Sequence, residues 1–140
     1  MLIHKVIQAI QPLQVIGNTD NLQLLHIQHL LIDSRQLGNE PLNTLFFAFK
    51  TSNNNGAMYI PTLIQKGVRC FVVEQNNPIL PELLKITNTE DNPIFLLVND
   101  TLTALQNLAI YKRSLYRGPV IGITGSNGKT VVREWLYQLL

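Results

Sequence analysis

Cysteine is almost absent from this chain of 140 residues, which contains only Cys70. A single cysteine excludes an internal disulfide and fits a reducing compartment. Cys70 stands at the start of an apolar run that continues through residues 71–73. We therefore expect a buried structural thiol at this position and not a nucleophile.

Charged residues and long apolar runs are also scarce. Charged residues make up 14% of the chain, and 11 Lys and Arg against 9 Asp and Glu leave a net charge of +2. The basic residues form no run, so no nucleic-acid partner is expected. No stretch is long enough to span a membrane, and residues 3–10 have the spacing of an amphipathic helix instead of a signal peptide. We expect a cytoplasmic protein.

The rest of the composition is that of a folded domain. Apolar residues make up 46% of the chain, which is long enough for one domain with a sizeable core. The three histidines, His4, His26 and His29, have no acidic or cysteine partner at metal-ligand spacing. None of them is therefore expected to hold a metal.

Short apolar runs alternate with helical patterns along the first 117 residues. The pattern predicts helices over 3–10, from 59 to a C-cap at Gly67, and from 101 after the N-cap candidates Asn99 and Asp100. It predicts strands over 13–16, 24–32, 45–49, 71–73 and 95–98. Alternating strands and helices indicate a layered α/β domain.

The most informative segment is residues 122–130, in which a glycine-rich turn lies between an apolar run and a helical pattern. Gly125 and Gly128 leave backbone N–H groups free to point at an anion, and the helix N-terminus adds its positive dipole end. Lys129 can reach the outer phosphates of a nucleotide, and the Thr130 hydroxyl can bind Mg²⁺. The general phosphate-loop pattern also has an earlier glycine, where this chain has Ile123.

Gly118 and Pro119 interrupt the chain just before this segment, and we place a domain boundary there. The first domain is predicted to span 1–117, and 118–140 to be the strand, loop and helix that begin a second domain. One strand and one helix cannot bury their own apolar faces. We therefore expect the chain to be a piece of a longer protein.

Three segments of the chain together form a recognisable set. The first is Leu-Ile-Asp-Ser-Arg at 31–35, and the second is Leu-Phe-Phe-Ala-Phe-Lys at 45–50 with the glycines and strand that follow it. The third is Ile-Thr-Gly-Ser-Asn-Gly-Lys-Thr at 123–130. Together they resemble the Mur ligases, which add amino acids to the peptidoglycan precursor, and the third is similar to the family's ATP loop. The resemblance implies a Mur-type N-terminal α/β domain followed by the start of a P-loop ATPase domain.

Within the family, Ser126 favours the members that add D-alanyl-D-alanine over those that add a diamino acid. Residues 131–137 look like a bacterial subgroup in which such a ligase is fused to an alanine racemase. One departure concerns the segment at 55–57, where the family often has Asp-Gly-His and this chain has Asn55, Gly56 and Ala57. The missing acid and imidazole put a polar role at positions 55 and 57 in doubt.

The resemblance implies an ATP- and Mg²⁺-dependent ligase of cell-wall biosynthesis, and hence a role in cell shape and division. Its partners would be UDP-N-acetylmuramoyl peptide, D-alanyl-D-alanine and the remaining domains of its own chain. The N-terminal domain would hold the UDP end of the precursor, and the central domain would hold ATP. Phosphorylation of the peptide carboxylate and attack by the amine would then give an amide, ADP and phosphate. The present chain alone is expected to be inactive.

The residues carried over from the family fall into two groups. The ATP loop comprises Gly125, Ser126, Asn127, Gly128, Lys129 and Thr130, with Lys129 catalytic and Thr130 a metal ligand. The UDP group comprises Ser34, Arg35, Ser52, Asn53 and Asn54. Other roles remain open for the second group, because Asp33 and Arg35 can simply cap a turn or pair with each other, and asparagines favour flexible turns.

Three other hypotheses remain. A diamino-acid-adding Mur ligase has the same domain order, and a non-catalytic nucleotide-binding module can keep the fold without the chemistry. A relative of folylpolyglutamate synthase shares the ATP loop but is expected to lack an N-terminal domain with Asp-Ser-Arg. The intact Gly128-Lys129-Thr130 argues against degeneration of the loop.

Overall fold

The computed structural model describes residues 1–17, 25–88 and 93–139. The five strands are β1 (Gln14–Ile16), β2 (His29–Leu31), β3 (Thr44–Phe47), β4 (Cys70–Glu74) and β5 (Ile94–Val98). The α-helices are α1 (Ile3–Ile10), α2 (Ile60–Gln65), α3 (Leu80–Leu84), α4 (Thr101–Ser114) and α5 (Lys129–Leu139). Short 3-10 turns include Ser34–Gln36 after β2 and Gly56–Tyr59 before α2.

The strands form one mixed sheet in the order β1-β5-β4-β3-β2. Strands β2 to β5 are parallel, and β1 joins the edge antiparallel to β5, with Val15 opposite Leu96. The central strands are apolar without alternation because helices cover both faces of the sheet. This is the mixed α/β architecture that the sequence predicts.

Each face of the sheet has its own apolar core. Helices α2 and α3 cover one face, where Phe46, Phe71 and Phe95 lie side by side. Helices α1 and α4 cover the other face, where Cys70 is fully buried. Burial raises the pKa of the Cys70 thiol to about 12, because a thiolate would have to lose its hydration there. The prediction of a buried structural cysteine is confirmed.

Local signals explain where the helices begin and end. The Asp100 side chain accepts a 2.6 Å hydrogen bond from the backbone N–H of Thr103 and so caps α4, as predicted. Helix α1 ends at Gln11, which adopts a left-handed conformation just before Pro12. The C-cap of α2 is Lys66, one residue before the predicted Gly67. Gly67 follows it with φ +95°, and its N–H donates to the Ile64 carbonyl at the end of the helix.

Two strand predictions need correction. The strand expected over 24–32 is limited to His29–Leu31 within the described residues, and Leu24 lies outside them. The strand expected at 120–123 is wrong: β5 is the last strand in the described part of the chain. A β-branched run becomes a strand only where another strand can pair with it, and residues 120–123 have no such neighbour here.

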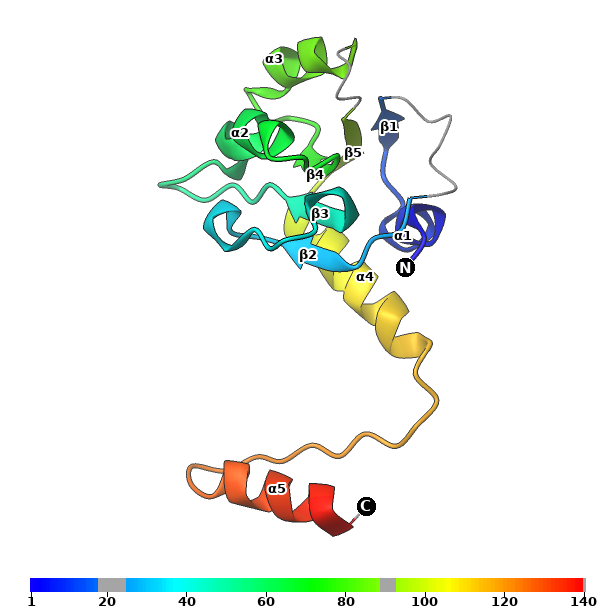
Figure 1. The fold of residues 1–140 in the computed structure, drawn as a ribbon, viewed down its shortest axis with the longest axis vertical. Coiled ribbons are helices and arrows are strands. Elements are labelled where there is room, and N and C mark those ends of the chain that lie inside the picture. The colour runs from blue at the N-terminus through cyan, green and yellow to red at the C-terminus, as the bar shows by residue number, and fades with distance from the viewer. Residues whose placement is uncertain (18–24, 89–92, 140) are drawn as a thin grey trace.

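Helix α5 forms where the sequence predicts it, but none of its described residues is buried. Figure 1 shows it apart from the sheet, joined to α4 by an extended segment. Trp135 is 64% exposed and Leu139 is 80% exposed. The domain boundary at residue 118 stays a prediction.

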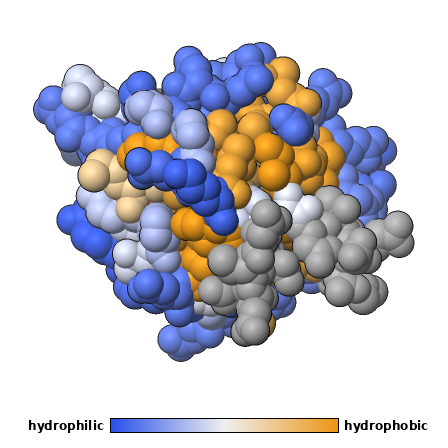
Figure 2. All heavy atoms as spheres, turned by 90° about the horizontal axis from the view of Figure 1, so that it is seen from above, coloured by the Kyte–Doolittle hydropathy of each residue, from blue (hydrophilic) through white to orange (hydrophobic). Residues whose placement is uncertain are grey.

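The surface of the sheet domain is mixed in character. Figure 2 looks onto the end of the molecule that carries α3, and apolar side chains gather there inside a border of hydrophilic ones. None of the helices in the described ranges combines the length and the apolar character that crossing a membrane requires.

Candidate functional site

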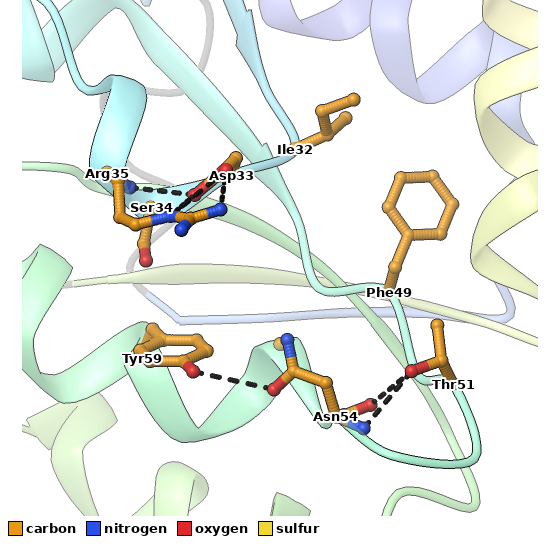
Figure 3. Close-up of a pocket in the computed structure, with 9 residues that line it drawn as sticks. Ile32, Asp33, Ser34, Arg35, Phe49, Thr51, Asn54 and Tyr59 are labelled. Carbon is orange, nitrogen blue, oxygen red and sulfur yellow. Dashed lines mark hydrogen bonds and ion pairs between the residues drawn. The ribbon is translucent and has the colours of Figure 1, made fainter.

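The Asp-Ser-Arg segment borders a pocket of about 420 Å³. Two loops form it, one leaving β2 and the other leaving β3, which are neighbouring parallel strands. Both loops therefore lie at the carboxyl edge of the sheet, where α/β domains usually bind ligands. The lining residues are Ile32, Asp33, Ser34, Arg35, Phe49, Thr51, Asn54, Gly56 and Tyr59 (Figure 3).

On the β2 side, Asp33 and Arg35 form a two-pronged ion pair. The Arg35 Nε donates to Asp33 Oδ1 at 2.9 Å, and Nη2 donates to Oδ2 at 2.6 Å. Oδ1 also accepts the Arg35 backbone N–H at 3.0 Å, so Asp33 caps the 3-10 turn as well. These hydrogen bonds to Arg35 lower the pKa of Asp33 to about 2 and raise the pKa of Arg35.

This ion pair limits what Arg35 offers to a ligand. Its side chain is 86% exposed, and the bonds to Asp33 use Nε and Nη2 but not Nη1. A ligand anion would have to use the remaining N–H groups or compete with the carboxylate. The turn-capping and pairing alternative left open by the sequence is therefore present in the structure, and a binding role for Arg35 stays a prediction.

On the β3 side, a tight polar turn faces this ion pair (Figure 3). The Thr51 N–H donates to the Asn54 carbonyl at 2.7 Å, and the Asn54 N–H donates to the Thr51 hydroxyl at 3.1 Å. The Tyr59 hydroxyl donates to Asn54 Oδ1 at 3.4 Å. The turn thus presents a hydroxyl, an amide and an aromatic ring to the pocket.

The structure brings together only part of the predicted UDP group. Ser34, Arg35 and Asn54 line the same pocket, whereas Ser52 and Asn53 lie at the exposed tip of the turn and do not line it. The sequence analysis did not assign Ile32, Phe49, Thr51 or Tyr59 to the site. Their place in the sequence could have indicated them, because all four lie after β2 or in the segment between β3 and α2.

The departure at positions 55–57 has a structural explanation. Asn55 Oδ1 accepts the Ala57 N–H at 3.1 Å, and the Asn55 amide group bonds reciprocally to that of Asn77. Ala57 is fully buried, where a larger polar ring would have no room without rearrangement. Position 55 therefore has a polar role in holding the turn, and position 57 has none.

The second candidate site is the glycine-rich turn before α5. Gly125 has φ +141° and Gly128 has φ +77°, conformations that glycine adopts without strain. The Lys129 ammonium donates to the Gly125 carbonyl, and a longer 3.5 Å contact joins it to the Ser126 carbonyl. Residues 124–130 are exposed, so the loop and its lysine are open to solvent.

The residues of this turn suit a metal–nucleotide complex only in part. Thr130 lies in the first turn of α5 and offers one hydroxyl oxygen. Mg²⁺ usually also needs one or two carboxylates, together with phosphate oxygens and water. Within the described ranges, no three His, Cys, Asp or Glu residues come together in a way that could hold a metal ion.

An α/β domain with a polar pocket at the Asp-Ser-Arg segment, followed by a glycine-rich loop, agrees with what the resemblance to the Mur ligases implies. Sequence comparison agrees: the chain is 32% identical over 142 residues to a UDP-N-acetylmuramoyl-tripeptide–D-alanyl-D-alanine ligase of Borreliella burgdorferi. The match covers 99% of this chain and 29% of that enzyme. A second ligase of this name, from Rickettsia prowazekii, is 36% identical over 96 residues, which cover 69% of this chain and 19% of the enzyme.

A different ligase is almost as similar. The UDP-N-acetylmuramoyl-L-alanyl-D-glutamate–2,6-diaminopimelate ligase of Bacteroides thetaiotaomicron is 31% identical over 142 residues, covering 99% of this chain and 26% of the enzyme. The chain is thus homologous to the Mur ligases along nearly its whole length, and the predicted resemblance is confirmed. It spans less than a third of the length of these relatives. No family model matches the chain, and no solved structure does.

Proposed function

We propose that this chain is the UDP-precursor-binding part of a Mur ligase that adds D-alanyl-D-alanine to UDP-N-acetylmuramoyl-tripeptide. The observation that carries the proposal is the pocket beside Asp33, Ser34 and Arg35, in a chain that matches one such ligase, that of Borreliella burgdorferi, over 99% of its length. The pocket volume of about 420 Å³ is in the range of small-ligand sites. The activity of the whole ligase, its substrates and its partners are part of the proposal.

The pocket offers the contacts that a pyrimidine nucleotide needs. Ser34, Thr51 and Asn54 supply hydroxyl and amide groups for the edges of the base and the ribose. The Tyr59 ring gives a flat surface for base stacking. The N–H groups of Arg35 that are not bonded to Asp33 would meet a phosphate oxygen at the mouth of the pocket.

In the whole ligase, the loop 125–130 would hold the phosphates of ATP. The N–H groups of Gly125, Ser126, Asn127 and Gly128 would surround the phosphate oxygens, and Lys129 would leave the Gly125 carbonyl to meet them. Thr130 would supply one ligand to Mg²⁺, which neutralises phosphate charge during transfer. The present chain alone would not catalyse ligation.

The diamino-acid-adding ligase is the second candidate. The similarity of the Bacteroides thetaiotaomicron enzyme to this chain supports it, since its identity is within one percentage point of that of the Borreliella burgdorferi enzyme. Ser126 favours the D-alanyl-D-alanine-adding enzyme. Ligation assays on the full-length protein with each amine would separate the two candidates.

The binding proposal can be tested on the 140-residue chain by titrating it with uridine, UDP and ATP while following backbone amide signals. UDP and uridine should shift the signals of Ser34 and Asn54, whereas ATP should not. Arg35→Ala should weaken UDP binding about fivefold to tenfold but leave uridine binding unchanged, because only UDP has a phosphate for the guanidinium.

Arg133→Ala is the matched control, because Arg133 is also exposed and faces a neighbouring carboxylate, that of Glu134, but it does not line the pocket. It should change neither affinity. Failure of both uridine and UDP to shift the pocket signals would show that the proposed UDP site is wrong.

A further inference from the structure

We propose that Asn77, which does not line the pocket, is a positioning residue for nucleotide binding, and this inference rests on the proposed function. Asn77 follows β4 and is only 2% exposed, which makes it one of the few buried polar side chains in the described part of the protein. A buried amide is stable only when its donors and acceptor are bonded.

The Asn77 amide meets these needs through Asn55. Its Nδ2 donates to Asn55 Oδ1 at 3.0 Å, and Asn55 Nδ2 donates back to Asn77 Oδ1 at 3.1 Å. Asn77 Oδ1 also accepts the Ile79 N–H at 3.2 Å, which fixes the Asn77 side chain to the start of the next turn. The pair joins two loops that lie 22 residues apart in the sequence.

Asn55 transmits this restraint to the pocket. Its Oδ1 accepts the Ala57 N–H at 3.1 Å and so begins the turn Gly56–Tyr59. Both ends of this turn line the pocket, Gly56 beside Phe49 and Tyr59 beside Asn54. Loss of Asn77 would leave the Asn55 side chain held by the Ala57 N–H alone and would loosen the turn that carries the Tyr59 ring.

The geometry therefore assigns to Asn77 an effect on the affinity for uridine nucleotides, and this effect acts through Asn55. Asn77→Ala removes both reciprocal hydrogen bonds, and we expect uridine affinity to fall about fivefold to tenfold in the folded protein. Asn55→Ala should cause a similar loss. The double variant should lose little more than either single variant, because both substitutions break the same link.

Thr101→Val is the matched control for general destabilisation. Thr101 is 1% exposed, and its hydroxyl donates to Glu74 Oε1 at 3.0 Å, but it does not line the pocket. This variant should lose stability while keeping wild-type uridine affinity at a temperature where all variants are folded. Equal affinity losses in Asn77→Ala and Thr101→Val, or none in Asn77→Ala, would overturn the proposal.

Hydrogen exchange separates this inference from the binding proposal. The Ala57 N–H donates to Asn55 and the Gly56 N–H donates to the Phe49 carbonyl at 2.8 Å, so both amides report on the turn without any ligand. Asn77→Ala should speed their exchange about tenfold, and Thr101→Val should not. If wild-type protein fails to bind uridine, the binding proposal fails. In that case the effect on nucleotide affinity fails with it, while faster exchange in Asn77→Ala still supports the hold of Asn77 on the turn Gly56–Tyr59, and unchanged exchange overturns that hold as well.

Discussion

Substitution of Gly56 by alanine tests the close approach on which the pocket wall depends. A Cβ atom built at Gly56 would lie 2.9 Å from the Phe49 carbonyl oxygen and 3.0 Å from the Phe49 nitrogen. It would also lie 3.2 Å from the carbonyl carbon of Ala48. All three neighbours are backbone atoms, so no side chain can rotate away. The added methyl group must move the turn away from the end of β3.

The loss of stability expected for Gly56→Ala follows from overpacking at this site. Forcing a methyl group into a packed site typically costs about 1–3 kcal/mol. Alanine also restricts the unfolded chain, which offsets about 0.4–1 kcal/mol of that cost. We therefore expect Gly56→Ala to lower the free energy of unfolding by about 1–2 kcal/mol. The same shift should stretch the 2.8 Å hydrogen bond from the Gly56 N–H to the Phe49 carbonyl.

Urea unfolding followed by circular dichroism measures this loss. With a urea m-value of about 2 kcal/mol/M, the midpoint should fall by about 0.5–1 M. Gly38→Ala is the matched control, because Gly38 is exposed and a Cβ there meets no atom within 4 Å. Its midpoint should stay the same or rise. Equal midpoints for the two variants would refute the steric argument, and unchanged uridine affinity in Gly56→Ala would refute its link to the pocket.

Four further predictions concern other parts of the chain. Asp100→Ala should lower the free energy of unfolding by about 1 kcal/mol in urea melts, because the Thr103 N–H loses its cap. Pairing with Arg35 lowers the pKa of Asp33 to about 2. Its contribution to stability should therefore be complete above the ordinary carboxyl pKa of 3.8 and be lost as the pH falls through about 2. Carbon-detected NMR titration of the Asp33 carboxyl checks this value, and Arg35→Ala should return it toward the ordinary one. Cys70 should resist a disulfide reagent at pH 8 until urea unfolds the chain, and rapid labelling of the native protein would contradict its burial. Amides of α5 should exchange faster than those of β4, because α5 has no buried residue, and equal protection would show that α5 packs against something in solution.

Short-range patterns in the sequence were sufficient to predict most of the elements. Apolar runs predicted the positions of the central strands, because strands buried on both faces need continuous apolar side chains. The N-cap at Asp100 was predicted correctly, because capping depends on neighbouring residues, and Gly67 lies one residue after the actual C-cap of α2, Lys66. The Asp-Ser-Arg segment and the glycine-rich loop were likewise visible as motifs.

Tertiary structure alone decided the features that depend on distant partners. The apolar run at 120–123 does not form a strand, because strand formation needs a neighbour that no local pattern supplies. Ser52 and Asn53 lie next to Asn54 in the sequence, yet the tight turn at Thr51 leaves them outside the pocket.

The Asn55–Asn77 pair shows the same limit of sequence reasoning. The two amides are 22 residues apart, and they meet only because the parallel strands bring the loops after β3 and β4 to the same edge of the sheet. The sequence by itself therefore determined which segments could form strands, caps and glycine-rich turns, because those choices depend on near neighbours. The tertiary structure decided which polar side chains face one another, because that depends on strand order and register.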